Sequence, residues 1–243
     1  MMMTTPGGEK LLRQLLEQMD PALQQISATE LASIFADSPD LSAGHHALAP
    51  RRWEDQIIEA LIPAGATVLD VGCGDGELLA KLLAKQVRGQ GIELDQSAVF
   101  KCVARGVPVL QIDVDRGLRE FADGSFDYVV LEETLQTVRR PVELLQEMVR
   151  VGARGIVSFP NFGFWKVRVD LLLRGRMPVT QELPWRWYDT PNIHLLCLQD
   201  FLDWVQQHKV KVVQAHVFAA GEVRPMQEGD TLYAEQCLLM VER

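Results

Sequence analysis

From Arg51 onward, short apolar runs alternate with helical patterns, and this alternation is the strongest restriction that the sequence places on the fold. The runs are short and often β-branched, as buried strands are. Five of them precede the last third of the chain: Thr67–Val71, Val87–Glu93, Val107–Ile112, Phe126–Leu131 and Gly155–Phe159. Strands that alternate with helices are joined by right-handed crossovers, so the sequence predicts a mostly parallel sheet with helices on both faces.

The last third of the chain departs from this rhythm. Two extended apolar runs, Val210–Phe218 and Thr231–Val241, follow one another with no helical pattern between them. Such strands can pair directly in antiparallel fashion. We therefore expect an α/β, Rossmann-like domain with a mostly parallel seven-stranded sheet and an antiparallel C-terminal strand.

The first 50 residues form a separate region in this interpretation. Apolar residues recur at helical spacing before Pro21: Leu11, Leu12, Leu15, Leu16 and Met19. The stretch 37–50 is rich in Pro, Ser, Gly and Ala, which is typical of a linker. The sequence thus predicts a helical arm and linker over residues 1–50 and one large domain over residues 51–243.

Charge and cysteine content argue against several kinds of partner and site. The 243 residues carry a formal net charge of -9, which disfavours nucleic acid, because its binding depends on Lys and Arg. The four cysteines form no CxxC pair, so we expect neither a metal cluster nor a dithiol redox site. No apolar run is long enough to cross a membrane, and Met1–Lys10 lacks the apolar core of a secretory signal. A cytoplasmic location is expected.

A turn with three glycines follows the first predicted strand and opens a leucine-rich helix. It reads Asp70-Val71-Gly72-Cys73-Gly74-Asp75-Gly76. Glycine lets the backbone adopt positive φ and come close to a ligand, and the helix N-terminus offers unpaired N–H groups. Ligands of such sheets bind at the carboxyl ends of the strands, near the point where the strand order reverses. The turn therefore predicts a nucleoside site.

The residue after the third glycine distinguishes between two classes of nucleoside cofactor. A dinucleotide turn, GxGxxG, needs a small residue in its last position, and here that position is Glu77, which disfavours a nicotinamide-dependent oxidoreductase. The acidic Asp70 followed by GxGxG instead resembles the first motif of the class I S-adenosylmethionine-dependent methyltransferases. The resemblance implies their Rossmann-like fold. It also implies that Asp70 orients the methionine end of the cofactor and that Gly72, Gly74 and Gly76 line its sugar and amino acid.

Acidic residues at the ends of the next strands extend this site. Glu93 ends the second strand about 20 residues beyond the turn, where a carboxylate can accept both ribose hydroxyls. The resemblance places Asp113, after the third strand, opposite the adenine amino group, and Glu132 follows the fourth strand. The predicted cofactor is S-adenosyl-L-methionine or S-adenosylhomocysteine, held by Asp70, Gly72, Gly74, Gly76, Glu93, Asp113 and Glu132.

A closer resemblance rests on three runs in the second half of the chain. They are VSFPNFGFW (157–165), GRMPVT (175–180) and WYDTPNIH (187–194). These runs resemble the MetW family of bacterial methionine biosynthesis proteins, and the likeness extends from the glycine turn through Thr134-Leu135-Gln136 to about Phe201. It implies a methyltransferase-like protein that acts with a homoserine O-acyltransferase. An active methyltransferase with an unidentified small acceptor and a regulatory subunit that binds S-adenosylmethionine both stay open.

Polar residues after the fifth strand are candidates for the acceptor side of the site. We expect Asn161, Tyr188, Asp189 and His194 near the acceptor pocket, and Asn161, Tyr188 and His194 are the catalytic candidates. Only His194 has an ordinary pKa that suits proton transfer near neutrality. A structural hydrogen bond that braces the loop after Pro191 is the alternative for His194.

The same region is rich in tryptophan and in basic residues. Trp165, Trp185 and Trp187 are interpreted either as a lid over the cofactor or as core residues. Five basic residues lie close together in an otherwise acidic chain: Lys166, Arg168, Arg174, Arg176 and Arg186. They fit an acidic partner surface or a carboxylate-bearing substrate, and a solvated helix face is the alternative.

Overall fold

The structure is a computed structural model that describes residues 53–180 and 182–243. The predicted helical arm and linker over residues 1–50 lie outside the described residues. Within them, eight strands form one sheet: β1 Thr67–Val71, β2 Arg88–Glu93, β3 Val109–Gln111, β4 Phe126–Glu132, β5 Gly152–Pro160, β6 Lys211–Ala219, β7 Glu222–Pro225 and β8 Gln236–Glu242. The helices are α3 Trp53–Leu61, α4 Glu77–Ala84, α5 Gln96–Ala104, η2 Val114–Arg116, α6 Pro141–Val151, α7 Trp165–Arg174, α8 Leu198–Gln207 and α9 Asp230–Tyr233.

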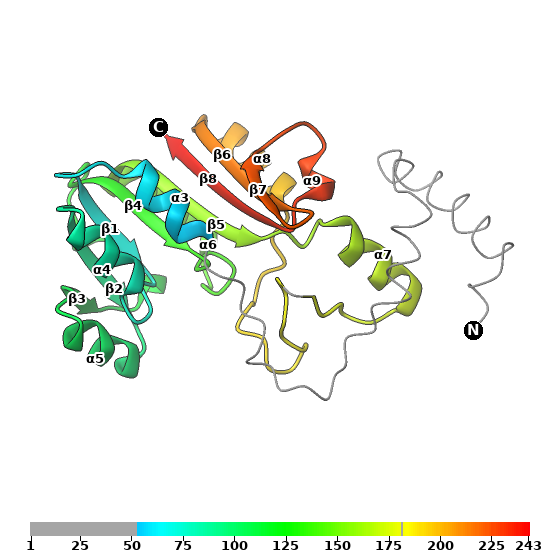
Figure 1. Ribbon diagram of the computed structural model, residues 1–243, viewed down its shortest axis with the longest axis horizontal. Coiled ribbons are helices and arrows are strands. Elements are labelled where there is room, and N and C mark those ends of the chain that lie inside the picture. Colours follow the sequence, from blue (N-terminus) through cyan, green and yellow to red (C-terminus); the bar gives the residue numbers. More distant parts are fainter. Residues whose placement is uncertain (1–52, 181) are drawn as a thin grey trace, which may run out of the picture.

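The strand order is β3-β2-β1-β4-β5-β8-β6-β7 (Figure 1). The first five strands in this order are parallel, β8 is antiparallel to β5, and β6 and β7 continue the sheet by antiparallel pairing. The predicted α/β class is confirmed. The order reverses between β1 and β4, so their carboxyl ends border the crevice in which such sheets bind ligands.

The C-terminal part differs from the sequence prediction in two details. The sheet has eight strands rather than seven, because β6 turns back into the short edge strand β7. The predicted strand Thr231–Val241 begins only at Gln236, because helix α9 occupies Asp230–Tyr233. The predicted antiparallel pairing itself is present, since β6 and β8 lie side by side.

Two apolar cores cover the two faces of the sheet. In β1, Leu69 packs with helices α6 and α8 on one face, and Val68 packs with α3, α4 and α5 on the other. Successive strand residues point to opposite faces, so both are completely buried. This double burial explains why the parallel strands are apolar throughout rather than alternating.

A third, smaller cluster lies beyond the carboxyl end of β5. Trp165, Val167 and Val169 of α7 pack there with Leu183 and with Leu232 of α9. Figure 1 shows α7 and the segment after it at the end of the molecule opposite α5 and β3. The region after β5 therefore forms a distinct layer at the ligand-binding edge of the sheet.

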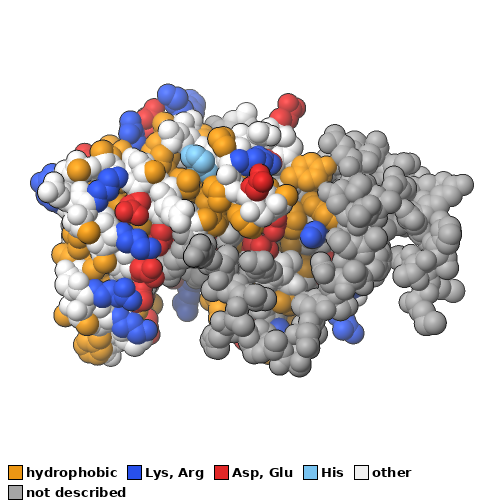
Figure 2. Space-filling model, in the orientation of Figure 1, with side chains coloured by type: hydrophobic (Ala, Val, Ile, Leu, Met, Phe, Trp, Pro, Cys, Tyr) orange, Lys and Arg blue, Asp and Glu red, His pale blue; other side chains and the backbone are white. Residues whose placement is uncertain are grey.

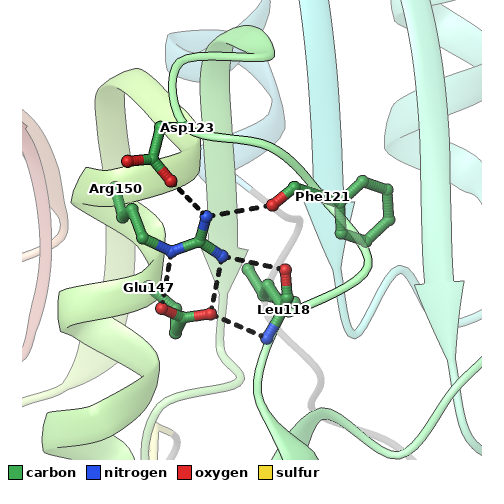
Figure 3. A network of polar contacts seen from close by, with 5 residues as sticks. All are labelled: Leu118, Phe121, Asp123, Glu147 and Arg150. Atoms are coloured by element: carbon green, nitrogen blue, oxygen red, sulfur yellow. Dashed lines mark hydrogen bonds and ion pairs between the residues drawn. The ribbon is translucent and has the colours of Figure 1, made fainter.

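A polar network fixes the loop that leads into β4 (Figure 3). The guanidinium of Arg150, on α6, donates to the carboxylates of Glu147 and Asp123 and to the carbonyl oxygens of Leu118 and Phe121. These contacts lower the pKa of Glu147 below its ordinary value, mainly through its hydrogen bond with Arg150. The network holds the loop against α6 and so helps to place β4.

No helix among the described residues has the length and apolar character needed to cross a membrane.

Candidate functional site

The three glycines of the turn after β1 all have positive φ, at 78° for Gly72, 55° for Gly74 and 78° for Gly76. Their surroundings nevertheless differ. A Cβ on Gly72 would lie 2.5 Å from Oγ1 of Thr134, and a Cβ on Gly76 would lie 2.9 Å from Sγ of Cys102. A Cβ on Gly74 would meet no atom within 4 Å.

The three glycines therefore have different roles in the turn. Gly72 and Gly76 allow neighbouring elements to pack closely against the turn, whereas Gly74 faces open space. The turn is held against β2, because the N–H groups of Gly72 and Cys73 donate to the carbonyl oxygen of Ile92 at 2.8 and 3.0 Å. Gly74 is therefore the glycine at which a ligand can approach the backbone.

Glu93 lies at the rim of this open space. Its Oε2 accepts the N–H of Gly74 at 2.9 Å, and its Oε1 accepts the N–H groups of Leu94 and Asp95 at 2.7 and 2.8 Å. A carboxylate has about four lone-pair positions, so Oε2 retains one for a further donor. Glu93 and the glycine turn therefore lie side by side, and the carboxylate is fixed in place there.

The other predicted acidic residues follow the ends of the neighbouring strands. Asp70 is 2% exposed near the end of β1, and Glu132 is the last residue of β4. Asp113 follows β3 and caps η2, where its Oδ1 accepts the N–H of Asp115 at 3.1 Å. Because β3, β2, β1 and β4 are adjacent and parallel, all four acids, Glu93 included, belong to one edge of the sheet.

Cys73, within the turn, is not a nucleophile in this setting. It is 6% exposed, and burial, with the nearby charge of Asp70, raises its pKa far above the ordinary thiol value. The thiolate is the reactive form of cysteine, so a raised pKa keeps this side chain inert. The interpretation of Cys73 as a small residue of the turn agrees with this environment.

The loop after β4 contains polar groups that sequence reasoning did not single out. Glu133 has a φ of 50°, which is unusual for a residue other than glycine, and its N–H donates to both the carbonyl and hydroxyl oxygens of Ser158. Gln136 is 2% exposed, and its Nε2 donates to the carbonyl and carboxylate oxygens of Glu133 at 3.0 and 2.9 Å. These two acceptors fix the orientation of the amide, which leaves the buried Oε1 of Gln136 without a hydrogen-bond partner.

His194 lies beside this loop. The N–H groups of Ile193 and His194 donate to the carbonyl oxygen of Gln136 at 2.9 and 3.1 Å. The side chain of His194 is partly buried, and its Nε2 is buried without a partner. Buried polar atoms are almost always paired in folded proteins, so each of these two unpaired atoms is a position at which a ligand or water can bind.

Asn161, one of the predicted acceptor residues, is buried and hydrogen bonded within the chain. It is 1% exposed, and its Oδ1 accepts the N–H groups of Gly163 and Leu198 at 2.9 and 3.0 Å. Its Nδ2 donates to the carbonyl oxygens of Ala234 and Thr231 at 2.8 and 3.3 Å. An amide can form four hydrogen bonds, and all four of these are internal. Asn161 therefore joins the end of β5 to α8 and α9.

Tyr188 and Asp189 lie on an outer turn. Tyr188 is 59% exposed, and its hydroxyl oxygen accepts a hydrogen bond from Arg186 at 2.9 Å. The Oδ1 of Asp189 accepts the N–H of Arg186 at 2.7 Å, which closes the turn. Trp165 is a core residue, at 4% exposed, whereas Trp187 is 77% exposed and lies outside the core. The structure brings His194, but not Tyr188, into contact with the loop after β4.

The fold and the glycine turn define a class I S-adenosylmethionine-dependent methyltransferase fold, and solved structures agree with this. A S-adenosylmethionine-dependent methyltransferase from Mesorhizobium loti superposes with a TM-score of 0.58 at 15% identity, covering 82% of this chain and 100% of that one. A second, from Methanosarcina mazei, gives 0.57 at 17% identity, covering 77% and 96%. At such identities the likeness concerns the fold alone.

The sequence comparisons then identify the family. The chain belongs to the MetW family, described as methionine biosynthesis protein MetW, whose model matches residues 52–241. A bifunctional methionine biosynthesis protein MetXA/MetW from Rhodopirellula baltica is 39% identical over 175 residues, which are 68% of this chain but only 28% of that protein. A demethylmenaquinone methyltransferase from Bacillus licheniformis is 25% identical, covering 70% of this chain and 82% of that protein.

Proposed function

We propose that this protein binds S-adenosylmethionine at the carboxyl ends of β1, β2 and β4 and acts in methionine biosynthesis together with a homoserine O-acyltransferase. One observation carries the binding proposal. Gly74 faces open space beside the fixed carboxylate of Glu93. That combination fits a ribose whose hydroxyls donate to a carboxylate while its ring lies against side-chain-free backbone.

The residues divide into groups toward this ligand. Gly74 admits it, Glu93 accepts from the ribose, and Asp70, with Gly72 and Gly76 behind it, holds the methionine end. Asp113, which follows β3, borders the adenine side, whereas Glu132, at the end of β4 on the other side of β1, borders the methionine end. When bound, S-adenosylmethionine supplies a methyl group activated by its sulfonium. The residues of the chain bind this ligand and orient it.

The partnership with an acyltransferase rests on the family and on one relative. The bifunctional relative carries both the MetXA and the MetW name in a single protein. Proteins that work together are kept at high effective concentration when they are joined in one chain. In this proposal the acylation chemistry belongs to the partner, and the chain reports the level of S-adenosylmethionine to it.

An active methyltransferase is the second candidate, and the loop after β4 favours it. The unpaired Oε1 of Gln136 can accept a hydrogen bond from a hydroxyl or amine, and His194, through its buried Nε2, can take up the proton that such a group loses. Tyr188, on the outer turn, stays a catalytic candidate only for a large acceptor that reaches beyond this loop.

Calorimetric titration of the full chain with S-adenosylmethionine tests the binding proposal. We expect Gly74→Arg to abolish measurable binding, because the arginine fills the open space. Gly106→Arg is the matched control, since Gly106 also has positive φ and nothing within 4 Å of its Cβ position but lies in the turn before β3. Glu93→Ala removes charged hydrogen bonds worth roughly 1.5–3 kcal/mol, which corresponds to about 10- to 140-fold weaker binding. Wild-type affinity in both site variants would show that the pocket is assigned wrongly.

The partnership needs a separate measurement. The rate of homoserine acylation by the acyltransferase is measured with and without this chain, and with and without S-adenosylmethionine. We expect the chain to change that rate and the ligand to modulate the change. An acylation rate that is indifferent to the chain would contradict the regulatory role, whereas methyl transfer to a small acceptor by the chain alone would establish the second candidate.

A further inference from the structure

Exposed apolar side chains gather in one segment of the chain. Eight of the fourteen large hydrophobic side chains that are exposed in the described residues lie between Leu171 and Leu195. Trp187 is the extreme case at 77% exposed, and Tyr188, Ile193 and Leu195 are each more than half exposed. Scattered single apolar residues on a surface are ordinary, but a concentration of this kind marks an interaction surface.

The most exposed part of this segment, which we call the aromatic turn (Trp185–Tyr188), is held in a fixed shape. The carboxylate of Asp189 accepts the N–H of Arg186, and the carbonyl oxygen of Arg186 accepts the N–H of Thr190 at 3.1 Å. The rings of Trp187 and Tyr188 meet edge to face, with centroids 5.5 Å apart. Side chains that are ordered before binding lose less conformational entropy when a partner covers them.

We propose that the aromatic turn is the surface on which the acyltransferase binds, an inference that rests on the partnership proposed above. Trp, Tyr and Arg are the residue types that contribute most binding energy in protein interfaces. The aromatic turn contains only these types, in the order Trp185-Arg186-Trp187-Tyr188. The expected complement is an apolar groove that receives the indole of Trp187.

The segment that contains the aromatic turn is more basic than the rest of the chain. Residues 165–195 contain five Lys and Arg against three Asp and Glu, in a chain whose net charge is -9. Arg176 is exposed at the end of α7, beside the exposed Met177. By contrast, the face in Figure 2 mixes both signs of charge over α4 and α5. A partner surface with carboxylates around an apolar groove is therefore attracted to this segment and repelled by the acidic remainder.

The position of the surface links it to the ligand site. His194 follows the aromatic turn by six residues and is hydrogen bonded through its N–H to Gln136, in the loop after β4. Two residues earlier in that loop, Thr134 lies against Gly72. A partner that binds the aromatic turn is thus connected to the glycine turn through a short, hydrogen-bonded path.

The test measures binding of the full chain to the homoserine O-acyltransferase of the same organism by calorimetry. We expect Trp187→Ala to weaken binding at least 10-fold, because the indole is an interface anchor. Phe100→Ala is the matched control, since Phe100 is 64% exposed on α5, at the far end of the sheet. Both variants should retain the wild-type melting temperature and the wild-type affinity for S-adenosylmethionine, because both side chains are mostly exposed to solvent and neither belongs to the predicted cofactor site.

The outcomes separate the two proposals. Wild-type chain that binds the acyltransferase, with Trp187→Ala binding equally well or Phe100→Ala equally impaired, overturns the location while the partnership stands. Wild-type chain that does not bind overturns the partnership and the location together. If light scattering shows a dimer that Trp187→Ala dissociates without weakening acyltransferase binding, the surface belongs to a second copy of this chain and the inference is wrong.

Discussion

Replacing Asn161 with alanine tests whether this residue, at the end of β5, stabilises the fold or acts at the acceptor site. The substitution removes four internal hydrogen bonds, three of them between 2.8 and 3.0 Å and one of 3.3 Å. Each bond contributes a net stabilisation of roughly 1 kcal/mol. The side chain is 1% exposed, so water does not replace the lost partners and a small cavity adds to the loss.

These contributions sum to a loss of about 3–5 kcal/mol in the free energy of unfolding, against a total of roughly 5–15 kcal/mol for an ordinary domain. Urea denaturation followed by circular dichroism measures this directly. Asn192→Ala is the control, since Asn192 lies in the same region with a partly exposed side chain, and its loss should stay below about 1 kcal/mol.

A folded, stable Asn161→Ala protein would refute the structural role. In particular, a loss of stability below about 1 kcal/mol, together with impaired methyl transfer or acyltransferase regulation, would return Asn161 to the acceptor site. A large loss of stability with unchanged affinity for S-adenosylmethionine in the fraction that is folded is the result that the hydrogen bonds predict.

Two further substitutions follow from the steric collision at Gly72 and from the partly buried carboxyl of Glu235. Gly72→Ala should destabilise the fold by several times more than Gly74→Ala in thermal unfolding, because only at Gly72 does the new Cβ collide with Thr134, at 2.5 Å, and equal effects would contradict this division of roles. Burial and the carboxylate of Glu182 raise the pKa of Glu235 to about 7. The folded state therefore binds the proton more tightly than the unfolded state, so stability is lost as the pH rises from about 4.5 through 7. Glu235→Gln should remove this loss, which melting temperatures between pH 5 and pH 8 will show, and an unchanged pH dependence would contradict it.

The arrangement of the glycine turn and Glu93 was predictable because its signals are local. The strand, the three glycines and the helix are consecutive, and Glu93 follows by about one βα unit, a spacing that the doubly wound fold fixes. The hydrogen bond from Gly74 to Glu93 shows that this spacing brings the two together.

The acceptor side was less predictable because its partners come from distant segments. Asn161 is paired with residues of α8 and of the segment around α9, which its neighbours in sequence do not reveal. Gln136 becomes a candidate site residue only in the folded structure, where Glu133 and His194 contact it. Sequence reasoning also missed helix α9. Its first residue, Asp230, is buried and forms an ion pair with Arg224 at 2.7 Å, and no local sequence pattern predicts that contact.

A crystal structure of this protein with S-adenosylhomocysteine tests the central claim most directly. We expect the ribose hydroxyls within hydrogen-bonding distance of the Glu93 carboxylate and the ligand in contact with the backbone at Gly74. A nucleoside bound elsewhere, or a glycine turn that packs closed against another part of the chain with no ligand beside it, would contradict it.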